Sequence, residues 1–95
     1  MNLNDKRIGE LKKLLTEICS ALVDYPKEMK ITNYFFGEDE DRRLAFVIDV
    51  AKEEVGKLIG KKGRMIESIR TIMRASGKLS ETRVVVQFKG EGIRE

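Results

Sequence analysis

The first part of the chain carries apolar residues at intervals of three and four positions, from Ile8 to Leu22. Charged residues fill the intervals, which is the pattern of a helix with one buried face. Pro26 follows, and the residue before a proline avoids helical backbone angles. The pattern therefore predicts a helix over about residues 5–24.

Two stretches rich in β-branched and aromatic residues come next, residues 29–36 and 44–50, with an acidic turn from Gly37 to Asp41 between them. The second stretch alternates apolar residues with others, as a half-buried strand does. Together they predict an antiparallel hairpin. The acidic turn lacks the ligand spacing of a calcium loop, so we expect a solvated loop without a metal.

The rest of the chain reads as two helices joined by a glycine turn, followed by a last strand. We expect Gly77 to end the second of these helices, residues 78–82 to form a polar loop and residues 83–88 to form the strand. The order helix, strand, strand, helix, helix, strand predicts an α+β fold. We expect a single domain over residues 1–95 with a flexible tail at 90–95.

Charge is unevenly distributed along the chain. Between Lys52 and Arg83 nine basic residues stand against four acidic ones, a net charge of +5, whereas the whole chain carries a formal charge of +3. A basic segment on a faintly acidic body attracts a polyanion to one face. Alternating charges are also typical of a solvated helix face, and both interpretations stay open at this point.

Several functional classes are disfavoured. No apolar run approaches the ~20 residues that span a bilayer, and the first residues do not resemble a signal peptide, so we expect a cytoplasmic protein without membrane contact. The chain has no histidine, and its one cysteine, Cys19, lies on the predicted buried face of the first helix. Because acid-base, nucleophilic and metal-dependent catalysis all lack residues, we expect no enzyme, no metal, no cofactor and no small-molecule substrate.

The segment VGKLIGKKGRMI, residues 55–66, carries the most specific signal. Its two glycines, at positions 60 and 63, let the backbone turn sharply and let another backbone come close. The next helix begins at about the second glycine, so its N–H groups and positive dipole end face the loop. Lys61, Lys62 and Arg64 add cations there. The segment therefore predicts a site for a phosphate.

Other phosphate-binding loops fit this segment less well. A P-loop has four residues between its glycines and then Lys followed by Ser or Thr, and the dinucleotide fingerprint also has a different spacing. A helix-turn-helix corner that needs glycine only for packing is an alternative. The loop Gly60-Lys61-Lys62-Gly63, between two helices and flanked by strands, resembles the signature of the KH domain.

The resemblance can be narrowed to one family. Residues 52–64, with Ile69-Arg70-Thr71, are similar to the KhpA family of bacterial RNA-binding proteins, which are free-standing type II KH domains. This resemblance implies an α-β-β-α-α-β fold with a three-stranded sheet packed against helices on one face, and a KH core at about residues 44–89. It also implies binding of single-stranded RNA, a role as an RNA chaperone, and a homodimer or a heterodimer with a KhpB-like protein.

A KH scaffold that acts mainly as a protein-interaction module through such dimers is the alternative function. In the RNA-binding interpretation, the loop holds the backbone of about four nucleotides and a groove beside it reads the bases. By resemblance, the groove also includes the strand edge near Val85 and Gln87 and a variable loop at 78–82. The expected RNA contacts are Lys57, Ile59, Gly60, Lys61, Lys62, Gly63, Arg64, Ile66, Arg70, Lys78 and Arg83.

Apolar residues near the loop are harder to assign. For Ile59 and Ile66, core packing and groove lining are equally compatible with the pattern, whereas the pattern favours the core for Ile69, Ile72 and Met73. Base stacking on aromatic side chains is expected to be minor, because the aromatic residues lie in strand patterns outside the helix-loop-helix segment. These residues are Tyr34, Phe35, Phe36, Phe46 and Phe88.

Overall fold

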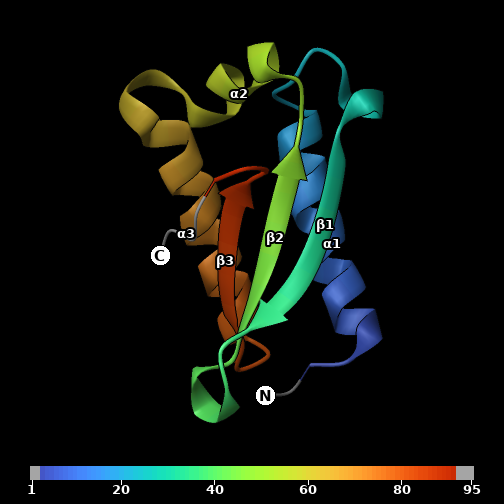
Figure 1. Cartoon of the computed structure of the whole chain (residues 1–95), viewed down its shortest axis with the longest axis vertical. Helices are drawn as coiled ribbons and strands as arrows, with labels where there is room; N and C mark the ends of the chain where they lie inside the picture. The colour runs from blue at the N-terminus through green and yellow to red at the C-terminus, as the bar shows by residue number, and fades with distance from the viewer. Residues whose placement is uncertain (1–2, 92–95) are drawn as a thin grey trace.

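The computed structural model describes residues 3–91. In that part of the chain three α-helices and three strands follow one another in the order α-β-β-α-α-β, so the predicted α+β fold is confirmed (Figure 1). The helices are α1 (Asp5–Ser20), α2 (Lys52–Ile59) and α3 (Arg64–Lys78), and the strands are β1 (Lys30–Phe36), β2 (Arg43–Asp49) and β3 (Arg83–Phe88).

The strands form one mixed sheet with β2 in the middle. β1 pairs with β2 in the antiparallel sense and β3 pairs with β2 in the parallel sense. A parallel pair needs a long crossover, and α2 and α3 supply it. Figure 1 shows α1 and α3 behind the sheet and no helix in front of it, so the helices cover one face only.

One hydrophobic core fills the space between the sheet and its helices. Alternate residues of β2 and β3, such as Phe46 and Val86, face α1 and α3 and are almost fully buried. Ile69 and Met73 lie in this core as predicted, and Ile66 joins them at 5% exposure. Ile72 does not: it is 44% exposed, so the prediction that it lies in the core was wrong. At about 100° per residue, Ile72 lies about 60° from Ile69 on the side opposite Ile66 and Met73, so it falls outside the buried face of α3.

α1 ends at Ser20, four residues before the predicted end at Asp24, which corrects that prediction. Its start is capped by Asn4, whose side chain accepts a hydrogen bond from the Arg7 N–H at 2.9 Å. At the other end, the N–H groups of Asp24 and Tyr25 donate to the carboxylate of Glu54, at 3.1 and 2.8 Å. These donors are therefore not available to continue the helix.

Gly77 was predicted to end α3, but the helix continues to Lys78. A Cβ atom at Gly77 would lie 2.5 Å from Val84 Cγ2 and 2.6 Å from the carbonyl oxygen of Thr82. The Gly77 carbonyl also accepts N–H bonds from Ser80 and Thr82, both at 2.9 Å. The glycine therefore lets α3 approach the start of β3 closely and turn back into it.

Glu91, the second residue of the predicted flexible tail, is hydrogen-bonded to the end of β3. The Glu91 N–H donates to the Phe88 carbonyl at 3.0 Å, and the Glu91 carboxylate accepts from the Phe88 N–H at 3.2 Å. The rest of that tail, residues 92–95, lies outside the described residues. Between residues 3 and 91, no helix is both long enough and apolar enough to cross a membrane.

Candidate nucleic-acid interface

The turn between α2 and α3 requires positive φ angles at three of its four residues. Gly60 and Gly63 both have φ of 74°, and Lys62 has φ of 56°. The turn closes with a hydrogen bond from the Gly63 N–H to the Gly60 carbonyl at 3.1 Å. A Cβ atom at Gly60 would come within 2.5 Å of the Met65 Cβ, so this position needs glycine for space as well as for φ.

The start of α3 faces this turn with positive charge. Gly63 is the N-cap residue, and having no side chain it cannot cap the first N–H groups of the helix. Lys61, Lys62 and Arg64 are exposed, and their side chains form no ion pair with any carboxylate of residues 3–91. The helix dipole and three cations therefore act at one point of the surface.

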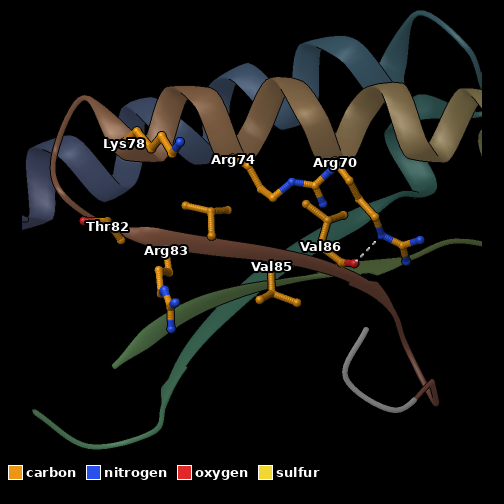
Figure 2. A pocket seen from close by; sticks show the side chains of 8 residues that line it. Arg70, Arg74, Lys78, Thr82, Arg83, Val85 and Val86 are labelled. Carbon is orange, nitrogen blue, oxygen red and sulfur yellow. Dashed lines mark hydrogen bonds between the residues drawn. The ribbon is translucent and has the colours of Figure 1, made fainter. Parts of the chain in front are cut away.

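A groove of about 230 Å³ runs between α3 and the outer edge of β3. In Figure 2, Arg74 and Lys78 extend from α3 along one wall, and the residues of β3 form the other. Arg70 marks the end nearer the turn, six residues and about 9 Å along the helix from Arg64. The lining residues are Arg70, Arg74, Lys78, Thr82, Arg83, Val84, Val85 and Val86.

Arg70 has a structural position in this groove. It is 5% exposed, and its Nε donates to the Val86 carbonyl oxygen at 3.1 Å, the bond drawn in Figure 2. Its Nη atoms lie 3.4 Å from carboxylate oxygens of Glu67 and Glu91. The guanidinium, which was expected to contact RNA, therefore joins α3 to the edge of β3.

Lys57, another expected RNA contact, is held by two carboxylates. Its Nζ donates to Asp24 Oδ2 and, at 2.8 Å, to Glu54 Oε1. The Lys57 ammonium and the N–H groups of Tyr25 and Asp24 lower the pKa of Glu54, while Asp24 and Glu54 raise the pKa of Lys57. Lys57 thus ties α2 to the segment between α1 and β1 and does not line the groove.

The other expected contacts divide into two groups. Gly60, Lys61, Lys62, Gly63 and Arg64 come together at the turn, whereas Lys78 and Arg83 lie at the far end of the groove. Ile59 is 36% exposed at the end of α2, whereas Ile66 is buried. Of the strand residues, Val85 lines the groove and Gln87 is buried beneath Tyr34, whose hydroxyl donates to its Oε1 at 3.0 Å.

Arg74 was missed in the sequence analysis. It is exposed in the groove wall between Arg70 and Lys78, and its Nη2 donates a hydrogen bond to Thr71 Oγ1 at 3.3 Å. Positions 70, 74 and 78 are four residues apart, and residues at that spacing lie on one side of a helix. This spacing of three basic residues was the signal that could have identified it.

Comparisons with known proteins place the chain in a family. The model of the KhpA/KhpB KH domain matches residues 12–88, a range that includes β1 and much of α1. The chain is 34% identical over 78 residues to the RNA-binding protein KhpA of Listeria monocytogenes, covering 82% of this chain and 97% of the relative.

Two further relatives carry the same name. The RNA-binding protein KhpA of Clostridium acetobutylicum is 35% identical over 78 residues, covering 82% of this chain and 99% of that protein. The one from Bacillus subtilis is 35% identical over 74 residues, covering 78% and 86%. These names describe binding proteins and not enzymes. No solved structure gave a significant match.

Proposed function

The chain belongs to the KhpA/KhpB family of KH domains, and from this premise we propose that it binds single-stranded RNA. One observation supports the proposal above all others. The glycine turn places its free cations at the start of the same helix whose further turns form one wall of the groove. An RNA strand whose backbone is bound at the turn can therefore continue along α3 in the groove.

The turn would hold the RNA backbone. A phosphate beside Gly60–Gly63 meets the positive end of α3 together with Lys61, Lys62 and Arg64. These side chains have no carboxylate partner to give up among residues 3–91, so binding a phosphate does not break an existing ion pair. Each neutralised phosphate should contribute a slope of about −0.7 to the dependence of log affinity on log salt.

The groove would receive the bases. Its volume is about 230 Å³, whereas pockets for small molecules usually exceed ~300 Å³, and its lining residues extend along α3 from Arg70 to Lys78. Backbone groups of alternate strand residues point to the same edge, so those of Val84 face the groove as the Val86 carbonyl does. Arg74 and Lys78 offer further phosphate contacts, and Ile59 offers an apolar surface beside the turn.

The test replaces both lysines of the turn, Lys61→Asp and Lys62→Asp. We expect the double variant to lose crosslinking to a pool of single-stranded oligonucleotides, because two attractive charges become repulsive. The fold should be retained, since both side chains are exposed and aspartate tolerates the positive φ of position 62.

A control with the same change in net charge is Lys6→Asp with Lys27→Asp, two exposed lysines outside the groove. Thermal unfolding of both double variants should stay close to that of the parent protein. Equal crosslinking of the Lys61 and Lys62 variant and the control at moderate salt would contradict the proposal.

We also propose that the protein acts as an RNA chaperone in the cytoplasm by means of this RNA binding. Contacts to phosphates do not depend on the RNA sequence, and an RNA strand bound in a single groove by few contacts dissociates readily. Such a protein can hold unpaired segments without trapping them. Acceleration of the annealing of two complementary strands, measured with fluorescent labels, should be present in the parent protein and absent in the Lys61 and Lys62 variant.

A specific surface favours a second candidate function, pairing with another chain. Met65 and Ile72 of α3 and Leu79, the residue that follows the helix, are 38%, 44% and 84% exposed. With Ser68 and Ala75 they follow the alternating three- and four-residue spacing of a coiled-coil seam. We propose a second copy of this chain as the partner. Two antiparallel copies related by a two-fold axis would place Ile72 against Ile72, and Met65 against Leu79.

A further inference from the structure

The sheet has a face that no described helix covers, opposite α1 and α3 (Figure 1). Successive residues of a strand point to opposite faces, and Ile31, Phe46 and Val86 point to the core. Their neighbours in each strand therefore belong to the other side, which we call the open face. It comprises Lys30, Thr32, Tyr34 and Phe36 of β1, Arg43, Ala45, Val47 and Asp49 of β2, and Arg83, Val85 and Gln87 of β3.

The ring of Tyr34 lies across this face. Its hydroxyl donates to Gln87 Oε1 at 3.0 Å, and the two residues stand on β1 and β3, on either side of β2. Ala45, the partner of Tyr34 on β2, is 0% exposed although no described helix lies above it. The ring therefore covers the middle strand on one side, and at 39% exposure it presents its other side to solvent.

Phe36 and Arg43 extend the surface made by the Tyr34 ring toward one end of the sheet. We call these three side chains the platform. The ring centroids of Tyr34 and Phe36 are 6.0 Å apart, and the Arg43 guanidinium carbon lies 5.6 Å from the centroid of the Phe36 ring. Basic side chains stand at both ends of the open face, and the acidic turn of residues 38–41 adjoins the end with Arg43 and Arg83. Lys30, Arg43 and Arg83 belong to the open face. Asp49 is the one carboxylate among the strand residues of this face, and Lys89 Nζ lies 3.4 Å from its Oδ2.

The open face is continuous with the groove. Val85 and Arg83 belong to the open face by strand alternation, and both also line the groove. One strand, about 5 Å wide, thus separates the groove from the platform. The Arg83 side chain is 61% exposed at this edge, where its contact with Asp41 is a 3.6 Å pair between exposed groups. Such a pair contributes little and leaves Arg83 able to meet a phosphate.

We propose that the open face is a second contact surface for single-stranded RNA, on which an unpaired base stacks against the ring of Tyr34. The inference rests on the proposed function, since it extends the bound strand from the groove over the edge at Arg83. Aromatic residues on a sheet surface stack bases in other RNA-binding folds, and the exposed Arg83 at the edge beside the groove can contact a phosphate of the same strand. This replaces the expectation that stacking on aromatic residues is minor.

The chain offers a direct test, because it contains two tyrosines and no tryptophan. Tyr25→Phe leaves Tyr34 as the only tyrosine, and Tyr34→Phe leaves Tyr25, which lies in the segment between α1 and β1. Each variant is titrated with a uridine oligonucleotide of about twelve nucleotides, and binding is followed by anisotropy of a label on the RNA. We expect RNA to quench the tyrosine emission of the Tyr25→Phe protein and not that of the Tyr34→Phe protein.

A second measurement uses affinity. Tyr34→Leu keeps an apolar cover over Ala45 but removes the aromatic face, and should weaken binding of the long oligonucleotide about tenfold. Binding of an oligonucleotide of about four nucleotides, which the groove alone can hold, should not change. Tyr25→Leu is the matched control, because it makes the same change at a tyrosine that is exposed (64%) and lies outside the open face.

The outcomes separate the two proposals. RNA binding with unchanged Tyr34 emission and unchanged affinity of Tyr34→Leu would overturn the stacking surface and leave the groove intact. Absence of RNA binding by every variant and by the parent protein would overturn both. A change of Tyr34 emission with protein concentration in the absence of RNA, without any change on adding RNA, would assign the open face to a protein contact and overturn the inference.

Discussion

Single residues decide whether the turn between α2 and α3 can form. Gly60 and Gly63 share the same φ of 74°, yet their surroundings differ. A Cβ atom at Gly60 would collide with Met65, whereas nothing lies within 4 Å of one at Gly63. Backbone angle therefore restricts both positions, and space restricts only the first.

We expect the two alanine substitutions to differ in cost. Gly63→Ala should lower the free energy of unfolding by about 1–2 kcal/mol, the cost of a left-handed conformation for a residue with a Cβ atom. Gly60 has ψ of 178°, a backbone conformation that only glycine adopts readily, and a Cβ atom there would also overlap Met65, so Gly60→Ala should cost about 3 kcal/mol or more. Denaturant unfolding of both variants measures the difference, and equal losses would show that the backbone angles and the space at Gly60 are no more restrictive than those at Gly63.

Residues of the same type near the turn could not be distinguished from the sequence. Lys57 and Lys61 both flank a glycine, but Asp24, 33 residues away, holds Lys57, whereas Lys61 has no such partner within residues 3–91. Arg70 and Arg74 lie one turn apart, and only Arg70 reaches the Val86 carbonyl. The two glycines predicted the turn correctly, but distant partners decide which of the cations near it are available.

At the scale of elements, the short helix α2 depends on one buried carboxylate. Glu54 is 3% exposed and accepts hydrogen bonds from two backbone N–H groups beyond α1 as well as from Lys57. These bonds favour the ionised form and lower the pKa of Glu54. A carboxyl group whose pKa is lower in the folded protein adds stability above its unfolded pKa, and this is lost as pH falls through the folded value.

Glu54→Gln should therefore lower the melting temperature at neutral pH. The gap between the parent protein and the variant should narrow as the pH is lowered below the ordinary glutamate pKa of 4.5, because the parent then loses the same charge. Thermal melts from pH 7 down to pH 3 measure the gap. Glu53→Gln, an exposed neighbour in α2, controls for the loss of a negative charge, and a gap that is constant with pH would contradict this role of Glu54.

Element order was predictable and some element ends were not. Hydrophobic periodicity predicted β3 and both helices around the turn, because these signals are local. The end of α1 depends on Glu54, 30 residues away from the N–H of Asp24. Gly77 is needed because α3 packs closely against Val84 of the next strand. The preference of glycine for helix ends, which considers only neighbouring residues, predicted instead that Gly77 ends α3.

At the scale of the whole molecule, the described residues 3–91 leave two apolar surfaces exposed after the core is formed. One is the platform of Tyr34 and Phe36 on the open face, and the other is the seam of Met65, Ile72 and Leu79 on α3 and just after it. Neither was predicted, since a pattern of apolar residues does not show which side of a sheet or helix is covered. Exposed apolar surface of this kind marks contact sites.

The seam on α3 predicts self-association. We expect the parent protein to form a dimer at high concentration and Ile72→Glu to stay monomeric, because a charge at the centre of the seam would face its own copy. The variant should keep its melting temperature, since Ile72 is 44% exposed. Sedimentation over a range of concentrations distinguishes the two states.

Tyr25→Glu places the same charge at another exposed apolar residue and should leave the dimer unchanged. A parent protein that sediments as a monomer at every concentration would rule out the seam as a self-association surface. If the dimer forms, RNA long enough to reach both copies should bind the parent more tightly than Ile72→Glu, through avidity.

The parallel pairing of β2 with β3 also determines when binding can begin during synthesis. The hairpin of β1 and β2 forms from neighbouring residues, but β3 can join it only after the α2–α3 crossover has been made. Contacts between distant parts of a chain form late because closing a long loop costs entropy. In a nascent chain on the ribosome, the cationic turn should therefore be exposed before the groove has formed. RNA should bind to both the turn and the groove only after residue 88 has left the exit tunnel.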